Sequence, residues 1–244
     1  MKQLLLLFAS LLPFVVVHAE TYVVCVGIAT YADSQLKDLN KTENDAKAMA
    51  ALYKIGTDNV ITITGKYATK AQILKSLRSQ FGRAGANDKI VFYFSGHGYP
   101  GGFCTYDMTN EKEGLLYADV INIMKESKAM SKFIFADACH SGSIRKPDTG
   151  ATADPLPGNI VFFLSSRGNE YSIESSTAAN GYFTKHLLRG LRGAADTDRN
   201  RKITASEIFQ YVSAEVTRQT NGKQHPVMWG KFDDNLTIVE YKKK

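Results

Sequence analysis

The chain has 244 residues, of which 44% are hydrophobic, and its formal net charge is +6. This length suits one domain with a sizeable core, and the composition excludes a disordered or low-complexity chain. The basic residues are scattered apart from Lys242–Lys244, so no basic stripe or recognition module predicts binding to nucleic acid.

Residues 1–19 have the pattern of a signal peptide. Lys2 supplies positive charge, residues 4–17 are almost wholly apolar, and Ala19 stands at a small-residue cleavage site. The apolar stretch is short for a permanent membrane span. We therefore expect a mature chain that starts near Glu20, is exported to the periplasm or the extracellular space, and has no stable membrane anchor. An uncleaved membrane tether is the alternative.

The next part of the chain alternates β-branched apolar runs with helical patterns of apolar residues. Residues 42–45 look like a capping signal for the first helix, and Thr69 is predicted to cap the second. The expected elements are, in order, a strand over 22–28, a helix over 46–53, a strand over 59–64, a helix over 69–79, a strand over 88–95, a helix over 114–126 and a strand over 132–136.

The later part continues the alternation after a loop over 141–158 that is rich in Ser, Gly, Thr and Pro. Strands alternating with helices predict right-handed βαβ units. We therefore predict an α/β fold, with a mostly parallel six-stranded sheet covered by helices on both faces. The remaining expected elements are a strand over 159–165, helices over 182–191 and 204–219, and a last strand over 236–241 at the sheet edge.

Two of the predicted strands end in turns that carry reactive side chains. Residues 93–98 read YFSGHG, and residues 137–142 read DACHSG. Sites in parallel α/β sheets form at the carboxyl ends of the strands, so the imidazole and the thiol are expected at one edge. We predict that Cys139 is a nucleophile and His97 its base. The amides of Gly98 and Cys139 are the candidate donors to an oxyanion.

The same residues also have a purely structural interpretation. A Cys at a strand end is usually a small packed hydrophobe, and a single His is usually structural. Neither Cys25 nor Cys104 has the spacing of a disulfide scaffold or of a CxxC metal motif. Spacing along the sequence alone leaves the catalytic and the structural interpretation open.

The two turns together, in this order and after these strands, resemble the caspase/metacaspase family of cysteine peptidases, and its bacterial metacaspase-like members most of all. The resemblance extends over nearly the whole mature chain. It implies a caspase-haemoglobinase fold over residues 20–244. It also implies a His97/Cys139 dyad that hydrolyses peptide bonds, with the oxyanion held by the amides of Gly98 and Cys139.

The resemblance further implies an acidic substrate pocket. Metacaspases carry an Asp two residues before the nucleophile, here Asp137, and one in a segment after the first strand, here Asp45. Paracaspase-like members add an acid after the fifth strand, here Glu170, and Ser95 would line the same pocket. Such carboxylates favour a cationic side chain, so we expect protein or peptide substrates with Arg or Lys before the scissile bond. The alternatives are that Asp45 caps its helix and that Glu170 is a solvated loop residue.

Residues 196–207 fit the oxygen ligands of an EF-hand loop. Arg201 stands where this loop normally needs Gly, and the neighbouring basic side chains repel a cation. The pattern of ligand oxygens still makes calcium a candidate cofactor. No cofactor is expected to be required for catalysis. The candidate calcium ligands are Asp196, Asp198, Asn200 and Glu207.

The leading prediction is thus a secreted cysteine endopeptidase, and we expect a monomer, as is common among metacaspases. One alternative is a catalytically weak caspase-like module that binds basic peptides without turnover. Another is a different thiol hydrolase, such as an amidase or a thioesterase. The intact His/Cys pair disfavours the first alternative, and the acidic pocket disfavours the second.

Overall fold

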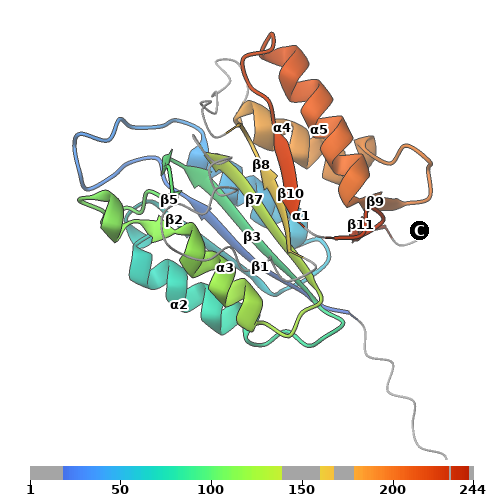
Figure 1. The fold of residues 1–244 in the computed structure, drawn as a ribbon, viewed down its shortest axis with the longest axis horizontal. Coiled ribbons are helices and arrows are strands. Elements are labelled where there is room, and N and C mark those ends of the chain that lie inside the picture. Colours follow the sequence, from blue (N-terminus) through green and yellow to red (C-terminus); the bar gives the residue numbers. More distant parts are fainter. Residues whose placement is uncertain (1–18, 139–159, 168–178, 231, 242–244) are drawn as a thin grey trace, which may run out of the picture.

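The computed structural model describes residues 19–138, 160–167, 179–230 and 232–241. These residues form a twisted sheet with helices on both faces (Figure 1). The α/β architecture expected from the alternation of strands and helices is confirmed. Residues 1–18 of the predicted signal peptide and the loop over 141–158 lie outside the described residues.

The main sheet has six strands in the order β10-β8-β7-β3-β1-β2. Neighbouring strands run parallel except β10, which is antiparallel to β8. The carboxyl ends of β1, β3 and β7 therefore meet at one edge of the sheet. The strands are β1 (Thr21–Gly27), β2 (Val60–Thr64), β3 (Lys89–Gly96), β7 (Ser131–Ala138), β8 (Ile160–Leu164) and β10 (Val227–Gly230).

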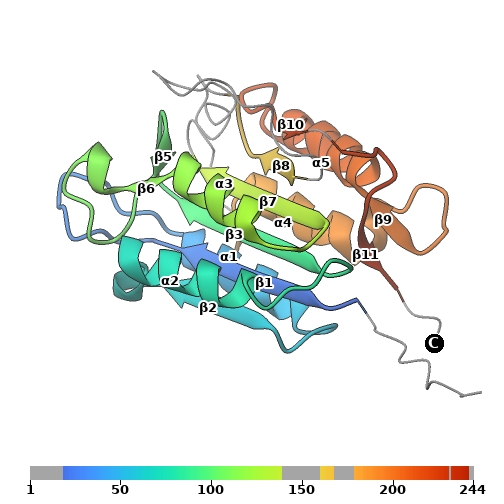
Figure 2. The ribbon, with the colours of Figure 1, turned by 60° about the horizontal axis from the view of Figure 1, so that its bottom comes forward.

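Two apolar layers hold the helices against the sheet. Alternate residues of each strand point to opposite faces, so Val24 and Phe92 belong to one core and Val23 and Tyr93 to the other. The first core packs under α2 (Lys70–Phe81) and α3 (Tyr117–Glu126), which lie side by side in Figures 1 and 2. The second packs under α1 (Thr42–Tyr53), α4 (Tyr182–Arg189) and α5 (Ala205–Gln219).

The strand expected at the sheet edge over 236–241 is placed elsewhere. The strand β11 (Thr237–Glu240) pairs with β9 (Lys202–Thr204) in a separate two-stranded sheet. The edge of the main sheet is instead β10, which the sequence analysis missed. All four residues of β10 are only partly buried, so this short strand lacks a clear apolar alternation.

The helix expected over 114–126 begins later, at Tyr117. Leu115 and Leu116 form β6 (Leu115–Leu116), which pairs with β5 (Gly102–Phe103). With β4 (Gly98–Tyr99), these strands make a small three-stranded sheet directly after the His97 turn. The shorter helical segments are η1 (Gly65–Tyr67), η2 (Glu111–Glu113) and η4 (Gly190–Ala194).

The helix starts differ from one another in how they are capped. Thr69 accepts a hydrogen bond from the amide of Gln72 and caps α2, as predicted. The expected capping signal at 42–45 is wrong, because α1 already starts at Thr42 and its cap position, Lys41, makes no side-chain capping bond. Asp45 lies inside the first turn of α1, so its carboxylate is available to other elements.

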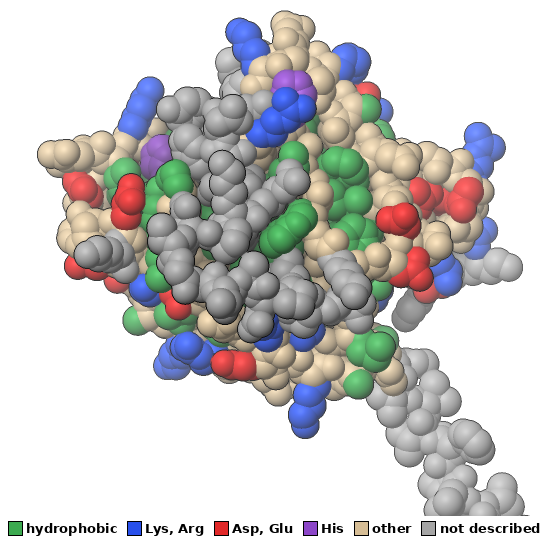
Figure 3. All heavy atoms as spheres, in the orientation of Figure 1, with side chains coloured by type: hydrophobic (Ala, Val, Ile, Leu, Met, Phe, Trp, Pro, Cys, Tyr) green, Lys and Arg blue, Asp and Glu red, His purple; other side chains and the backbone are tan. Residues whose placement is uncertain are grey.

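The surface carries its charges in a dispersed pattern. On the face shown in Figure 3, Lys and Arg side chains stand apart around the rim. In the described part of the chain, no helix is long and apolar enough to cross a membrane.

Candidate active site

The two strands that lead to the candidate dyad end level with one another. β3 and β7 are neighbours in the sheet, with Ser95 paired to Asp137 and Gly96 paired to Ala138. His97 follows Gly96 directly, and Ala138 is the residue before Cys139. Cys139 itself lies outside the described residues. The register therefore brings the backbone on either side of the candidate dyad to one point of the sheet edge.

His97 is held by the segment that follows β1. Its backbone N–H donates to the hydroxyl of Tyr31 at 2.7 Å, and the two rings lie 5.1 Å apart. Its Nε2 lies 2.6 Å from the carbonyl oxygen of Lys37. Because a carbonyl oxygen can only accept, Nε2 carries the hydrogen in this contact. The lone pair of the neutral ring is then on Nδ1, which is the nitrogen that can accept a proton.

Asp45 is almost completely buried, with 2% of its surface exposed. Its Oδ2 accepts a hydrogen bond from the hydroxyl of Ser95 at 3.0 Å. Its Oδ1 accepts from Nδ2 of Asn180 at 2.7 Å and from the amide of Gly181 at 3.2 Å. These bonds show that Asp45 links α1 to β3 and to the start of α4 and does not cap its own helix.

Asp137 points to the same place from β7. Its Oδ2 accepts from both the amide and the hydroxyl of Thr184, at 3.2 Å and 2.7 Å. A Cβ atom added to Gly181 would lie 2.9 Å from Oδ2 of Asp137 and 3.5 Å from Oδ2 of Asp45. The two carboxylates therefore flank Gly181, and a larger residue there would collide with Asp137.

The close pair of acids has a distinct electrostatic character. Burial and, after it, the charge of Asp137 raise the pKa of Asp45 from 3.8 to about 7, against the opposing effect of the hydrogen bonds from Asn180, Ser95 and Gly181. Near neutral pH, Asp45 is thus poised between its charged and neutral forms. A cation brought beside it would favour the charged form.

The structure assembles three of the four predicted pocket residues, namely Asp45, Ser95 and Asp137. The fourth, Glu170, lies outside the described residues. Gly98, a predicted oxyanion donor, begins β4 and pairs with Phe103 immediately after the His97 turn. The pocket residues thus come from α1, β3 and β7, which meet at the edge predicted to hold the site.

The sequence analysis missed the contribution of α4. Asn180, Gly181 and Thr184 supply donors to the two carboxylates, and Lys37 supplies the carbonyl that faces His97. The Asn-Gly pair before an apolar helical pattern was a signal of a helix start. Nothing in the sequence showed that this helix start would reach two acids more than forty residues away.

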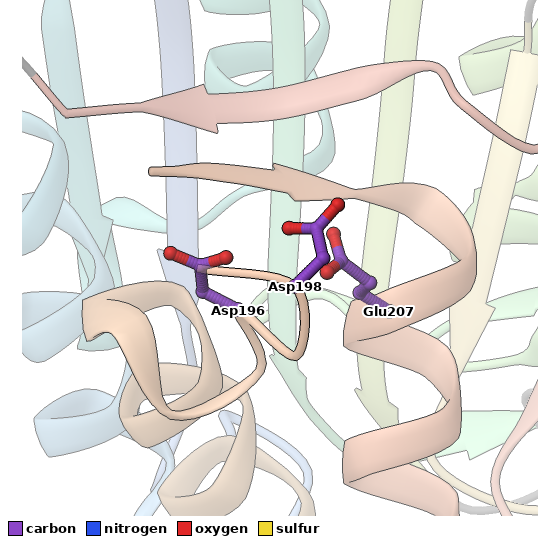
Figure 4. Close-up of side chains that lie close together, drawn as sticks. All are labelled: Asp196, Asp198 and Glu207. Carbon is purple, nitrogen blue, oxygen red and sulfur yellow. The ribbon is translucent and has the colours of Figure 1, made fainter. Parts of the chain in front are cut away.

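The candidate calcium loop forms a compact turn before α5. Ligand oxygens of Asp196, Asp198 and Glu207 lie within 4.8 Å of one another, and Figure 4 shows Glu207 on the first turn of the helix. Arg201 adopts φ 69°, the left-handed backbone that glycine usually supplies.

The carboxylates of this loop already serve the protein itself. Oε1 of Glu207 accepts from Thr197, and its Oε2 accepts from Thr204. Glu207 and Thr204 together form the capping box at the start of α5. The amide of Asn200 donates to both Asp196 and Asp198. These bonds and the basic residues of the loop fit calcium poorly, and we derive no catalytic step from it.

Family comparison then gives the site its context. Residues 21–237 match the family model of the caspase domain. The chain belongs to the caspase family. This match confirms the family that was predicted from the two turns. Members of this family are cysteine peptidases. No curated protein matches the chain.

Solved structures agree with this assignment at the level of the fold. The chain is similar to caspase-1 from Spodoptera frugiperda, with 15% identity, a TM-score of 0.70, and coverage of 92% of this chain and 93% of that chain. It is also similar to a protein from Geobacter sulfurreducens, with 17% identity, a TM-score of 0.64, and coverage of 88% and 94%. The six-stranded sheet of this chain is therefore a caspase fold.

Proposed function

We propose that this caspase-family protein is a cysteine endopeptidase that cuts peptide bonds after Arg or Lys. The observation that carries the proposal is the buried pair Asp45 and Asp137 beside the turn that presents His97. Two neighbouring buried carboxylates, of which Asp45 has a pKa raised to about 7, form a receptor suited to a positively charged side chain.

The dyad would carry out the chemistry in two stages. Nδ1 of His97 accepts the thiol proton of Cys139, and the thiolate attacks the carbonyl carbon of the scissile bond. The amides of Gly98 and Cys139 donate to the oxyanion, and His97 then protonates the leaving amine. Water, activated by the same imidazole, hydrolyses the thioester that remains. The Lys37 carbonyl supports these steps by fixing the ring so that Nδ1 stays the proton acceptor.

The acid pair would select the residue before the cut. Ser95, Gly181 and Thr184 are buried, while Asn180 is only half-buried, so a substrate side chain would approach the carboxylates from the side of Asn180. Arg suits the site well because its planar guanidinium can pair with two carboxylate oxygens at once. Glu170 would add a third negative charge to this pocket.

Export, a monomeric state and independence from a cofactor complete the proposal. The pattern of residues 1–19 supports removal of a signal peptide and release to the periplasm or the extracellular space. His97 and Cys139 together supply every proton transfer of the two stages, so no metal has a role in them.

Fluorogenic peptides that end in Arg, Lys or Asp test the proposal directly. We expect the purified protein to turn over the Arg and Lys peptides, and a matched Cys139→Ala variant to turn over none. Hydrolysis of the Asp peptide alone would overturn the basic specificity. Tight binding of Arg peptides without turnover would instead identify a binding module.

A further inference from the structure

Thr184 is a polar residue that donates hydrogen bonds to one of the two acids, Asp137. It lies on α4, is completely buried, and is the third residue of that helix. Its amide and its hydroxyl both donate to Oδ2 of Asp137, at 3.2 Å and 2.7 Å. Its hydroxyl oxygen also lies 2.5 Å from the hydroxyl of Tyr93 on β3. One side chain thus connects the two strands that lead to the dyad.

The direction of these hydrogen bonds follows from counting protons. The Thr184 hydroxyl has one hydrogen, and Asp137 as a carboxylate can only accept, so that hydrogen points to Asp137. The Tyr93 hydroxyl must then donate to Thr184. Tyr93 is itself fully buried, and burial raises its pKa well above 10, so it remains a donor at every physiological pH. The chain from Tyr93 through Thr184 to Asp137 therefore has a fixed orientation.

The start of α4 gives this chain a further role. Its cap position, Gly181, has no side chain, so the helix has no side-chain cap of its own. Two acids from other elements take that place, since Asp45 accepts from the amide of Gly181 and Asp137 from that of Thr184. Amides in the first turn of a helix lack partners inside the helix and favour a nearby negative charge. The start of α4 therefore keeps both acids turned toward its amides.

We propose that Thr184 is a positioning residue for substrate selection, which holds Asp137 charged and correctly oriented to receive the cationic side chain before the cut. This inference rests on the proposed function. Two donors on one oxygen favour the ionised form of Asp137, while Asp45 beside it is the acid whose pKa is raised. The pocket then presents one negative charge whose position Thr184 sets.

The test compares Thr184→Val, which keeps the shape of the side chain, with Thr184→Ser, which restores the hydroxyl. We expect Thr184→Val to raise KM for an Arg peptide roughly tenfold or more while changing kcat much less, because a hydrogen bond to a charged group is lost. Thr184→Ser should stay near the wild type. A peptide with uncharged citrulline in place of Arg should respond to neither change.

Two further variants separate positioning from folding. Thr184→Val leaves the Tyr93 hydroxyl without its acceptor, and this buried polar group could unfold the single variant. The double variant Thr184→Val/Tyr93→Phe removes both hydroxyls and should keep the fold. Thr105→Val is the matched control, because Thr105 is also fully buried and its hydroxyl has no hydrogen-bond partner among the described residues. We expect the double variant to show the raised KM and the control to leave KM unchanged.

Binding supplies a second readout that does not need turnover. Acetyl-arginine amide is titrated into the Cys139→Ala protein with and without Thr184→Val, and we expect affinity to fall roughly tenfold. Equal affinities in these two inactive proteins, together with an equal KM for the wild type and the active Thr184→Val variant, would overturn the inference and leave the basic specificity standing. If the unaltered pocket neither binds the arginine compound nor prefers Arg peptides, the proposed function fails and the inference fails with it.

Discussion

Replacing Asp45 by Asn should make the protein more stable at alkaline pH and abolish the proposed selectivity for cationic side chains. Asn has nearly the same shape, and its side-chain oxygen can still accept from Asn180 and Gly181 while its amide meets the Ser95 hydroxyl. The variant removes the cost of holding a buried negative charge next to Asp137. That cost is present only when Asp45 is ionised.

The size and the sign of the effect follow from the pKa of Asp45. A pKa raised from 3.8 to about 7 corresponds to roughly 4 kcal/mol at most, since each tenfold change in proton affinity is about 1.36 kcal/mol. The folded protein binds the proton more tightly than the unfolded chain, so wild-type stability falls as pH rises from about 4 to about 7. Asp45→Asn should therefore match the wild type near pH 4 and exceed it at pH 8.

Urea denaturation at pH 4, 6 and 8 measures this difference. We expect a gain of a few kcal/mol at pH 8 for Asp45→Asn, and none for Asp58→Asn, an exposed control of the same chemistry. In parallel, kcat/KM for an Arg peptide should fall roughly a hundredfold or more, because the variant loses the negative charge that Asp45 acquires beside a bound cation and keeps only that of Asp137. Equal or lower stability of Asp45→Asn at pH 8 would refute the reasoning about the buried pair.

Three other changes give separate tests. Tyr31→Phe removes the acceptor of the His97 amide and should lower kcat about tenfold without unfolding the protein, as steady-state kinetics would show; an unchanged kcat would mean that this bond does not position the imidazole. Thr204→Ala breaks the capping box of α5 and should lower the thermal midpoint by a few degrees, about 1 kcal/mol, in calorimetry; no shift would show that the cap is dispensable. His186 is fully buried and burial lowers its pKa, so the contribution of the neutral imidazole to the free energy of unfolding is complete above about pH 6.5 and is lost at lower pH. The stability difference between wild type and His186→Leu should therefore change between pH 7 and 5 in urea titrations, and a constant difference would contradict this assignment.

The strands that carry the site were predictable because their sequences are continuous apolar runs. β3 and β7 are buried on both faces, and the small-residue turns after them marked where each strand ends. Parallel pairing then required both turns to lie at one edge. In the described residues, Ser95 and Asp137, each two residues before a member of the predicted dyad, pair across β3 and β7 although they lie far apart along the chain. Their assignment to a substrate pocket came from the family resemblance and not from the strand pattern.

The hydrogen bonds that hold Asp45 and Asp137 could not be predicted in the same way. Thr184 sits in a helix whose pattern indicates only which face is buried, and its partners Asp137 and Tyr93 come from two other strands. Asp45 was predicted as a pocket residue from the family resemblance, and a capping role stayed open as the alternative because acids are common at helix starts. Its actual partners depend on how α4 crosses the sheet, which is a tertiary arrangement without a local sequence signal.

The prediction for the C-terminal strands was wrong for a related reason. Residues 237–240 have the composition of a sheet strand, but β10 already occupies the edge of the main sheet. A strand pattern predicts that a segment will pair and does not indicate its partner. Lys89 contributes to the actual placement, since its side chain at the start of β3 donates to the carbonyl of Ile238.

Peptide-library cleavage, with the cut sites mapped by mass spectrometry, tests the central claim most directly. The purified protein is compared with Cys139→Ala under identical conditions, with and without calcium. We predict cuts after Arg and Lys in the unaltered protein, none in the variant, and the same pattern in both calcium conditions. Cuts after acidic or neutral residues, or cuts that persist in Cys139→Ala, would contradict a His97/Cys139 peptidase with an acidic pocket.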